Sequence, residues 1–87
     1  MAAIITDPVS GRRMEMWTDQ PGLQFYSGNM LSPQRAGKGG IAPRPGDAFC
    51  LEPQHWPDSP NRPDFPSSTL RAGERYRHHT RLRFTTE

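Results

Sequence analysis

The sequence lacks a long hydrophobic run. No apolar stretch approaches the roughly 20 residues that a membrane-spanning helix needs. The apolar start at residues 1–5 is also too short for the core of a signal peptide. We therefore expect a soluble chain without a targeting segment and without a membrane partner.

Cysteine is nearly absent, because Cys50 is the only one in the chain. A single thiol excludes an internal disulfide and any zinc site that needs several thiolates. This usage suits a reducing compartment, so the expected location is the cytoplasm.

Large apolar side chains are scarce as well. Val, Ile, Leu and Phe make up only 13 of the 87 residues, whereas 10 Pro and 8 Gly favour turns and loops. The formal net charge of +2 is too small for the self-repulsion typical of disordered chains. We expect a small core that needs a further surface to complete it.

Alternation of apolar and polar residues is the main structural signal. No helix-length window has apolar residues at i, i+3, i+4 and i+7, so the sequence predicts an all-β protein of antiparallel strands. The predicted strands span residues 2–6, 12–18, 23–27, 48–52 and 75–84. A turn at residues 7–11 should join the first two as a hairpin, because its proline and glycine suit a tight reversal.

Two long irregular segments separate the later strands. Residues 31–47 are mostly Gly, Pro and basic residues, which predicts a long loop. In residues 55–68 a proline recurs every third position, a spacing that matches one turn of polyproline II. Such a series could dock in an aromatic-lined groove, but a stiff loop crossing the surface is the interpretation we favour.

The last predicted strand alternates along its whole length, and arginines dominate one face. We expect this face to be wet and the face of Tyr76, Leu82 and Phe84 to be buried. A row of arginines can bind phosphate or nucleic acid, with a steep salt dependence. Because the net charge is small and no binding motif accompanies the row, we expect no nucleic-acid partner. We interpret the arginines as charges on the exposed face of a sheet that protect its edge against pairing with other chains.

Glu52 and Gln24 are the residues best placed for chemistry. Glu52 precedes a proline at a predicted strand end, and Gln24 has the same phase in another strand. A carboxylate beside an amide suits a polyhydroxyl ligand, since one accepts a proton and the other both donates and accepts hydrogen bonds. On the residues alone, two solvated side chains would be the commoner explanation.

The histidines give a weaker signal. His78 and His79 are adjacent and point to opposite faces of a strand, so they cannot share a metal ion at the usual spacing. His55 lies in a predicted loop. We expect no metal site and assign no catalytic role to these three.

Several ordered motifs resemble the C-terminal part of the aldose 1-epimerase (galactose mutarotase) family. They lie at residues 20–31 (QPGLQFYSGNML), 37–40 (GKGG), 49–61 (FCLEPQHWPDSPN) and 70–78 (LRAGERYRH). The resemblance covers nearly the whole chain. It implies that residues 1–87 form the closing strands of one large antiparallel β-sandwich of the galactose-mutarotase type.

The resemblance also implies roles for the two candidate residues. Glu52 corresponds to the general base that takes the proton from the anomeric hydroxyl, and Gln24 to a glutamine that contacts the sugar. The family's general acid is a histidine on an upstream part of the chain, and His55, His78 and His79 do not match its motif. His78 corresponds to a histidine common in the family's last strand, which we interpret as structural. Pro53 and His79 stand where the family commonly has Thr.

The expected function is interconversion of α and β anomers of hexoses such as galactose or glucose, without a metal or organic cofactor. Because the acid is absent from these motifs, we expect the 87 residues alone to be inactive and a missing N-terminal part of the same fold to complete the site. The alternative is a non-catalytic carbohydrate-binding or protein-interaction remnant.

Overall fold

The computed structural model describes residues 1–86, and all strand pairs in it are antiparallel. The strands are β1 (Ala3–Thr6), β2 (Arg12–Thr18), β3 (Gly22–Tyr26), β4 (Cys50–Gln54) and β5 (Thr80–Thr86), with short 3-10 helices η1 (Lys38–Gly40) and η2 (Ser59–Asn61). The prediction of an all-β antiparallel fold is confirmed. Among these residues no helix has the length and apolar character to cross a membrane.

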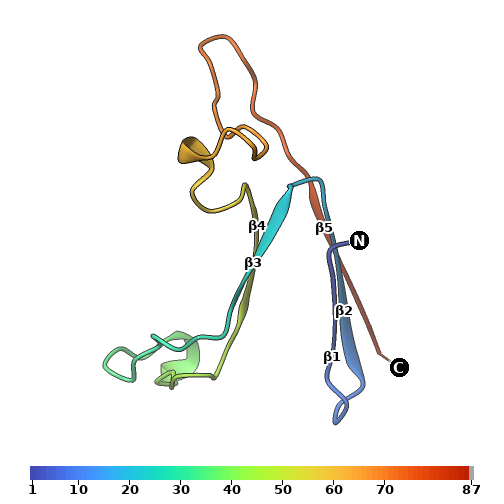
Figure 1. Ribbon diagram of the computed structural model, residues 1–87. Coiled ribbons are helices and arrows are strands. Elements are labelled where there is room, and N and C mark those ends of the chain that lie inside the picture. The colour runs from blue at the N-terminus through green and yellow to red at the C-terminus, as the bar shows by residue number, and fades with distance from the viewer. Residues whose placement is uncertain (87) are drawn as a thin grey trace.

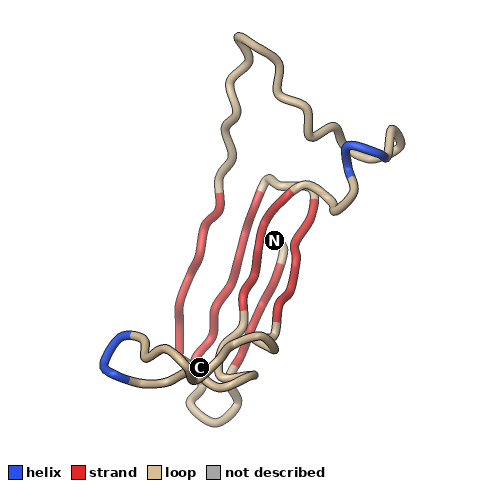
Figure 2. Tube along the Cα trace, turned by 90° about the vertical axis from the view of Figure 1, so that its left-hand side faces the viewer, coloured by secondary structure: helices blue, strands red, loops and turns tan. Residues whose placement is uncertain are grey.

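The strands form two separate sheets that lie side by side as layers (Figure 1). The first has the order β1-β2-β5, and the second pairs β3 with β4. The loop between β3 and β4 extends from one end of the strands, whereas the segment between β4 and β5 extends from the other (Figure 2).

The β1–β2 hairpin forms where the sequence predicts it. The Asp7 amide donates to the Arg12 carbonyl at 2.8 Å, and Gly11 has the positive φ of 69° that its lack of a Cβ permits. The Asp7 carboxylate accepts hydrogen bonds from the Ser10 hydroxyl and the Val9 amide, and these bonds lower its pKa. Local turn chemistry therefore fixes this hairpin.

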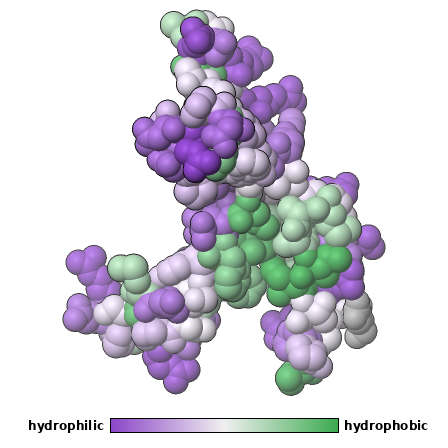
Figure 3. All heavy atoms as spheres, viewed as in Figure 1, coloured by the Kyte–Doolittle hydropathy of each residue, from purple (hydrophilic) through white to green (hydrophobic). Residues whose placement is uncertain are grey.

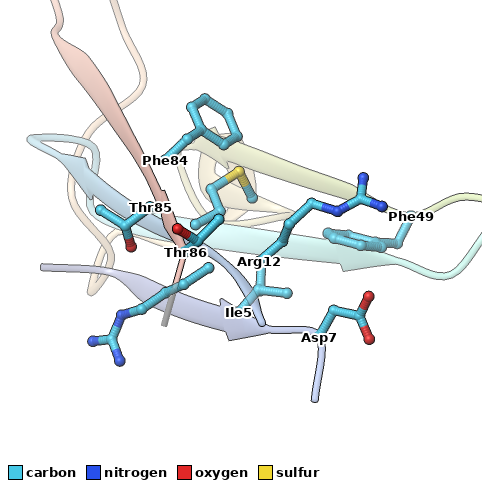
Figure 4. A pocket seen from close by; sticks show the side chains of 9 residues that line it. Ile5, Asp7, Arg12, Phe49, Phe84, Thr85 and Thr86 are labelled. Atoms are coloured by element: carbon cyan, nitrogen blue, oxygen red, sulfur yellow. The ribbon is translucent and has the colours of Figure 1, made fainter. Parts of the chain in front are cut away.

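The apolar faces of the two sheets face each other. Met16 of β2 is the most buried hydrophobic side chain described, at 5% exposure. On the opposite layer the Phe25 and Phe49 rings are 6.1 Å apart, and Phe49 lines a shared hollow of about 800 Å³ with Met14 and Phe84 (Figure 4). Figure 3 shows the hydrophobic side chains gathered at this level of the strands. The space between the layers is thus only partly filled.

The last strand is shorter at its start than the alternation predicts. Strand β2 ends at Thr18, which pairs with Thr80, so residues 75–79 have no strand beside them. The His79 amide donates instead to the Asp19 carboxylate at 3.0 and 3.1 Å. The expected buried face was also wrong, because Leu82 is 45% and Phe84 71% exposed.

The proline-rich segment is a folded surface loop and not a continuous polyproline II helix. Turns at residues 57–58 and 63–64 flank η2, and Asp58 adopts a left-handed φ of 68°. The Trp56 and Phe65 rings meet edge to face at 4.7 Å between centroids, and the Arg62 guanidinium lies 4.5 Å from the Phe65 ring centre. These contacts fold the segment back on itself.

Candidate functional site

Gln24 and Glu52 lie directly opposite each other in the β3–β4 register. Directly opposed residues of an antiparallel pair project from the same face of the sheet. Phe25 is on the other face, where its ring contacts Phe49 at the hollow between the layers. Gln24 and Glu52 therefore share the surface that points away from the three-stranded sheet.

One detail of the predicted site was wrong. Glu52 is in the middle of β4 and not at its end, because the strand continues through Pro53 to Gln54. A proline is tolerated in a strand where its nitrogen faces away from the partner, as on an outer edge. Glu52 therefore has strand residues both before and after it in the chain.

Both side chains are exposed, and they differ in their partners. The Gln24 amide nitrogen donates to the Phe25 carbonyl at 2.9 Å. No side chain among residues 1–86 forms a hydrogen bond or an ion pair with the Glu52 carboxylate. The carboxylate is therefore available to a ligand.

A hollow of about 220 Å³ lies beside Gln24, and Glu52 is not among the residues that line it. Gln24 lines it with Gln54, His55 and Trp56, together with Gly22, Leu23 and Pro57. Amide, imidazole and indole groups thus surround a space next to the carboxylate strand. His55, which the sequence placed in a loop without a role, lies at this hollow.

Trp56 ties the hollow to the start of β3. Its indole nitrogen donates to the Pro21 carbonyl at 2.8 Å. A Cβ at Gly22 would lie only 2.6 Å from Trp56 Cδ1 and 3.2 Å from the Gln54 carbonyl, so only glycine leaves room for the ring. Sequence reasoning missed this contact, although a tryptophan two residues after the end of β4 was the signal available.

The opposite ends of β3 and β4 are tied together by the returning loop. The Gly46 amide donates to the Gly28 carbonyl at 3.1 Å, and a Cβ at Gly28 would approach the Ala48 carbonyl to 2.4 Å. The Tyr26 hydroxyl accepts a hydrogen bond from the Met30 amide at 2.8 Å. Contacts at both ends thus keep the register that opposes Gln24 to Glu52.

The two C-terminal histidines lie in the segment between β4 and β5, and neither lines the hollow beside Gln24. His78 packs against Tyr76 at 5.4 Å between ring centres, and His79 Nδ1 lies 3.8 Å from the Asp19 carboxylate. Within residues 1–86, no group of three or more His, Cys, Asp or Glu side chains is arranged to hold a metal ion.

Comparison with known proteins matches residues 1–83 to the family model described as aldose 1-epimerase. The galactose mutarotase of Mus musculus is 46% identical over 83 residues, which are 95% of this chain and 24% of the relative. The galactose mutarotase of Homo sapiens is 49% identical over 76 residues, 87% of this chain and 22% of the relative. The aldose 1-epimerase of Escherichia coli K12 is 42% identical over 80 residues, with shares of 86% and 22%.

This chain spans less than a quarter of the length of these curated relatives. The family model nevertheless covers nearly all of its residues, and the identities exceed 40% in mammalian and bacterial relatives alike. The chain belongs to the aldose 1-epimerase family.

Proposed function

We propose that residues 1–87 are the C-terminal part of an aldose 1-epimerase domain and carry the base half of its sugar site. The observation that supports this most directly is the opposition of Gln24 and Glu52 on one exposed face. Glu52 acts as the general base at the anomeric hydroxyl, and Gln24 hydrogen-bonds a sugar hydroxyl. The free Glu52 carboxylate has the acceptor capacity that this role requires.

The chemistry consists of proton transfers around one bond cleavage. Glu52 takes the proton of the C1 hydroxyl, the electron pair of that O–H bond forms the C=O bond, and the bond from C1 to the ring oxygen breaks. The ring oxygen takes a proton from a general acid. The aldehyde then rotates about the C1–C2 bond and the steps reverse, so closure gives the other anomer.

The general acid lies outside these residues in our proposal. His55 faces the hollow beside Gln24, but it does not match the family's acid motif. A base without its acid loses one of the two proton transfers, each of which typically contributes a factor of about 10²–10⁴. We therefore propose that a further section of the family fold supplies the acid and that the isolated chain is inactive.

The proposed substrates are hexoses such as galactose or glucose. Each step above balances with protons alone, so the proposed reaction uses no metal or organic cofactor. The proposed location is the cytoplasm, where Cys50, exposed and unpaired, would remain a thiol.

A chimera tests the assignment of the base. The matched part of human galactose mutarotase is replaced with this chain, and polarimetry follows freshly dissolved α-D-galactose. We expect the chimera to accelerate mutarotation and Glu52→Gln to reduce kcat by about 10²–10⁴-fold. The Gln24→Ala variant should mainly raise KM. A chimera that keeps its rate after Glu52→Gln would contradict the proposal.

The isolated chain tests the second half of the proposal. Purified residues 1–87 should not change the rate of mutarotation above buffer. Acceleration that Glu52→Gln abolishes would show that the chain holds its own acid, and His55→Ala would then identify whether that acid is His55.

A non-catalytic carbohydrate-binding remnant is the second candidate, and the polar hollow with an indole wall favours it. Trp56 offers a face on which a sugar ring can stack, and Gln24 and Gln54 supply amides beside it. Weak galactose binding by NMR titration, lost in Gln24→Ala and without rate enhancement, would support this candidate.

A further inference from the structure

The face of β3 and β4 that carries Gln24 and Glu52 carries a third polar side chain, that of Gln54. We propose that Gln54 is a further substrate-binding residue, which hydrogen-bonds a hydroxyl on the side of the hexose ring away from C1. Glu52 then acts at C1 while Gln54 holds the opposite side of the same sugar. This inference rests on the proposed function and adds a residue to its catalytic site.

The strand register places Gln54 on this face. Gly22 is directly opposite Gln54, as Gln24 is directly opposite Glu52. Side chains two residues apart in a strand point to the same face and are separated by about 7 Å along the chain. Gln54 is therefore the next side chain after Glu52 in this row, at a separation that a single hexose with its hydroxyls can span.

Gly22 leaves space beside Gln54 because it has no side chain. Gly22, Gln24, Gln54 and Trp56 are among the residues that line the hollow of about 220 Å³. The Trp56 indole lies where a side chain at Gly22 would be, since a Cβ there would come within 2.6 Å of Trp56 Cδ1. That Cβ would point to the same face as Gln24. The hollow thus continues the surface that begins at Gln24 and Glu52, and it ends at the indole.

The Gln54 side chain is half-buried and has no hydrogen-bond partner within residues 1–86. The Gln24 amide differs, because it already donates to the Phe25 carbonyl at 2.9 Å. A side-chain amide can donate two hydrogen bonds and also accept them, and leaving it partly desolvated without a partner is unfavourable. A sugar hydroxyl, which both donates and accepts, supplies the missing partner.

The indole wall of the hollow is held in place by three contacts. Trp56 Nε1 donates to the Pro21 carbonyl at 2.8 Å, the Phe65 ring meets the indole edge to face at 4.7 Å between centroids, and Gly22 lies directly beside it. A wall fixed in this way keeps the hollow in one shape. A sugar at Glu52 that extends past Gln24 therefore meets Gln54 before it reaches the indole.

A contact on the far side of the ring suits the proposed reaction. After the ring opens, the aldehyde rotates about the C1–C2 bond, and the hydroxyls at C3 and C4 need not move. A hydrogen bond on this side keeps the open-chain sugar in place until the ring closes again. Because the same bond exists in the ring and open-chain forms, its loss should weaken binding more than it slows the chemistry.

Deoxy sugars test this contact in the chimera with human galactose mutarotase. The substrates are galactose and the four deoxygalactoses that lack the C2, C3, C4 or C6 hydroxyl, and polarimetry gives kcat and KM for each. With galactose, Gln54→Ala should raise KM about 3- to 10-fold and leave kcat nearly unchanged. This penalty should disappear for one sugar, the one without the C3, C4 or C6 hydroxyl that Gln54 contacts. It should persist for the sugar without the C2 hydroxyl, because C2 is next to C1.

Gln34→Ala is the matched control. Gln34 is exposed in the loop between β3 and β4, so the same substitution there should leave KM unchanged for every sugar. Thermal unfolding shows whether each variant is folded. Gln54→Met keeps the approximate volume of the side chain and removes the amide, so it should show the same pattern of KM values even if Gln54→Ala unfolds.

Three results would overturn the inference. The first is an unchanged KM for galactose in both Gln54 variants. The second is a KM that rises equally for all five sugars, as expected if another section of the family fold covered the hollow. The third is a penalty that disappears for the sugar without the C2 hydroxyl, which would place Gln54 beside C1.

Failure of the proposed function has a different signature, because Glu52→Gln would then leave kcat of the chimera unchanged. If Glu52→Gln reduces kcat while Gln54→Ala affects all sugars equally, the assignment of the base stands and the role of Gln54 is wrong.

Discussion

The two sheets each hold a glutamate within a strand, and the surroundings of the two carboxylates differ. Glu15 of β2 has a side chain only 13% exposed, and it pairs with Arg13 at 3.0 Å and with Arg83 at 3.9 Å. Glu52 of β4 is exposed, faces an amide across the strands and has no side-chain partner among residues 1–86. The Glu15 carboxylate is paired within its sheet, and the Glu52 carboxylate has free acceptor positions.

This difference separates a structural acid from a candidate catalytic one. The Arg13 guanidinium already donates to the Glu15 carboxylate, and the Arg83 guanidinium lies 3.9 Å away, so a substrate hydroxyl would have to compete with a charged donor. The Glu52 carboxylate has no such competition. Position in a strand alone therefore does not separate the two glutamates, whereas their partners across the sheet do.

The largest expected effect comes from neutralising each of the two glutamates in turn in the chimera. Glu52→Gln should reduce the catalytic rate by about 10²–10⁴-fold and leave thermal stability nearly unchanged. Glu15→Gln should leave the rate unchanged and reduce stability by about 1 kcal/mol, because it removes the charge between two arginines. Polarimetry and thermal unfolding measure the two effects. A lost rate in Glu15→Gln with an unchanged rate in Glu52→Gln would contradict the assignment.

Truncation of one apolar side chain in each sheet tests how tightly the two sheets are packed. Met16→Ala should reduce the free energy of unfolding by about 2–5 kcal/mol, since Met16 is buried. Phe25→Ala should cost about 1 kcal/mol or less, because Phe25 is 60% exposed. Urea unfolding measures both. A loss of stability in Phe25→Ala as large as that in Met16→Ala would mean that Phe25 is packed more tightly than its exposure indicates.

Gly22→Ala tests whether Trp56 holds β3 and β4 in register. The new Cβ would collide with the indole, so we expect a loss of about 1–3 kcal/mol and a shift of tryptophan fluorescence. Gly37→Ala is the control, because its φ is ordinary and a Cβ there would meet only the Ile41 carbonyl at 3.7 Å. An unchanged spectrum in Gly22→Ala would contradict this role of Trp56.

The smallest expected effects concern the turn aspartates attached to each sheet. Hydrogen bonds from the Ser10 hydroxyl lower the pKa of Asp7, and those from Arg44 lower the pKa of Asp47, both from an ordinary 3.8. Each contributes stability above pH 3.8 that is lost as the pH falls through its lowered pKa. NMR titration should show the Asp7 pKa rising in Ser10→Ala. Added salt should raise the pKa of Asp47 more than that of Asp7, because the partner of Asp47 is the charged Arg44 and that of Asp7 is the neutral Ser10. Equal responses of the two pKa values would contradict this assignment of partners.

Much of the fold was accessible from the sequence, and the reasons are local. Alternation located all five strands, and turn chemistry located the β1–β2 hairpin, whose turn bonds join residues between Asp7 and Arg12. Strand ends were less predictable. β4 passes through Pro53 and β5 begins at Thr80, because each end depends on where the partner strand ends.

The candidate site was predictable only in part. The shared phase of Gln24 and Glu52 suggested one face, and the register places them opposite each other. The hollow with His55, the bond from Trp56 to Pro21 and the isolation of Glu52 from any arginine had no local signal. Each depends on residues that are distant in the chain.

The strand pattern, the hairpin turn and the family of this chain could all be predicted from its amino-acid sequence. Which strands are neighbours and which glutamate is paired became visible only in the three-dimensional arrangement. The physical reason is range: backbone preference and alternation act over a few residues. Register and pairing instead follow from contacts such as Gln24 with Glu52 and Glu15 with Arg83, which exist only once distant strands meet.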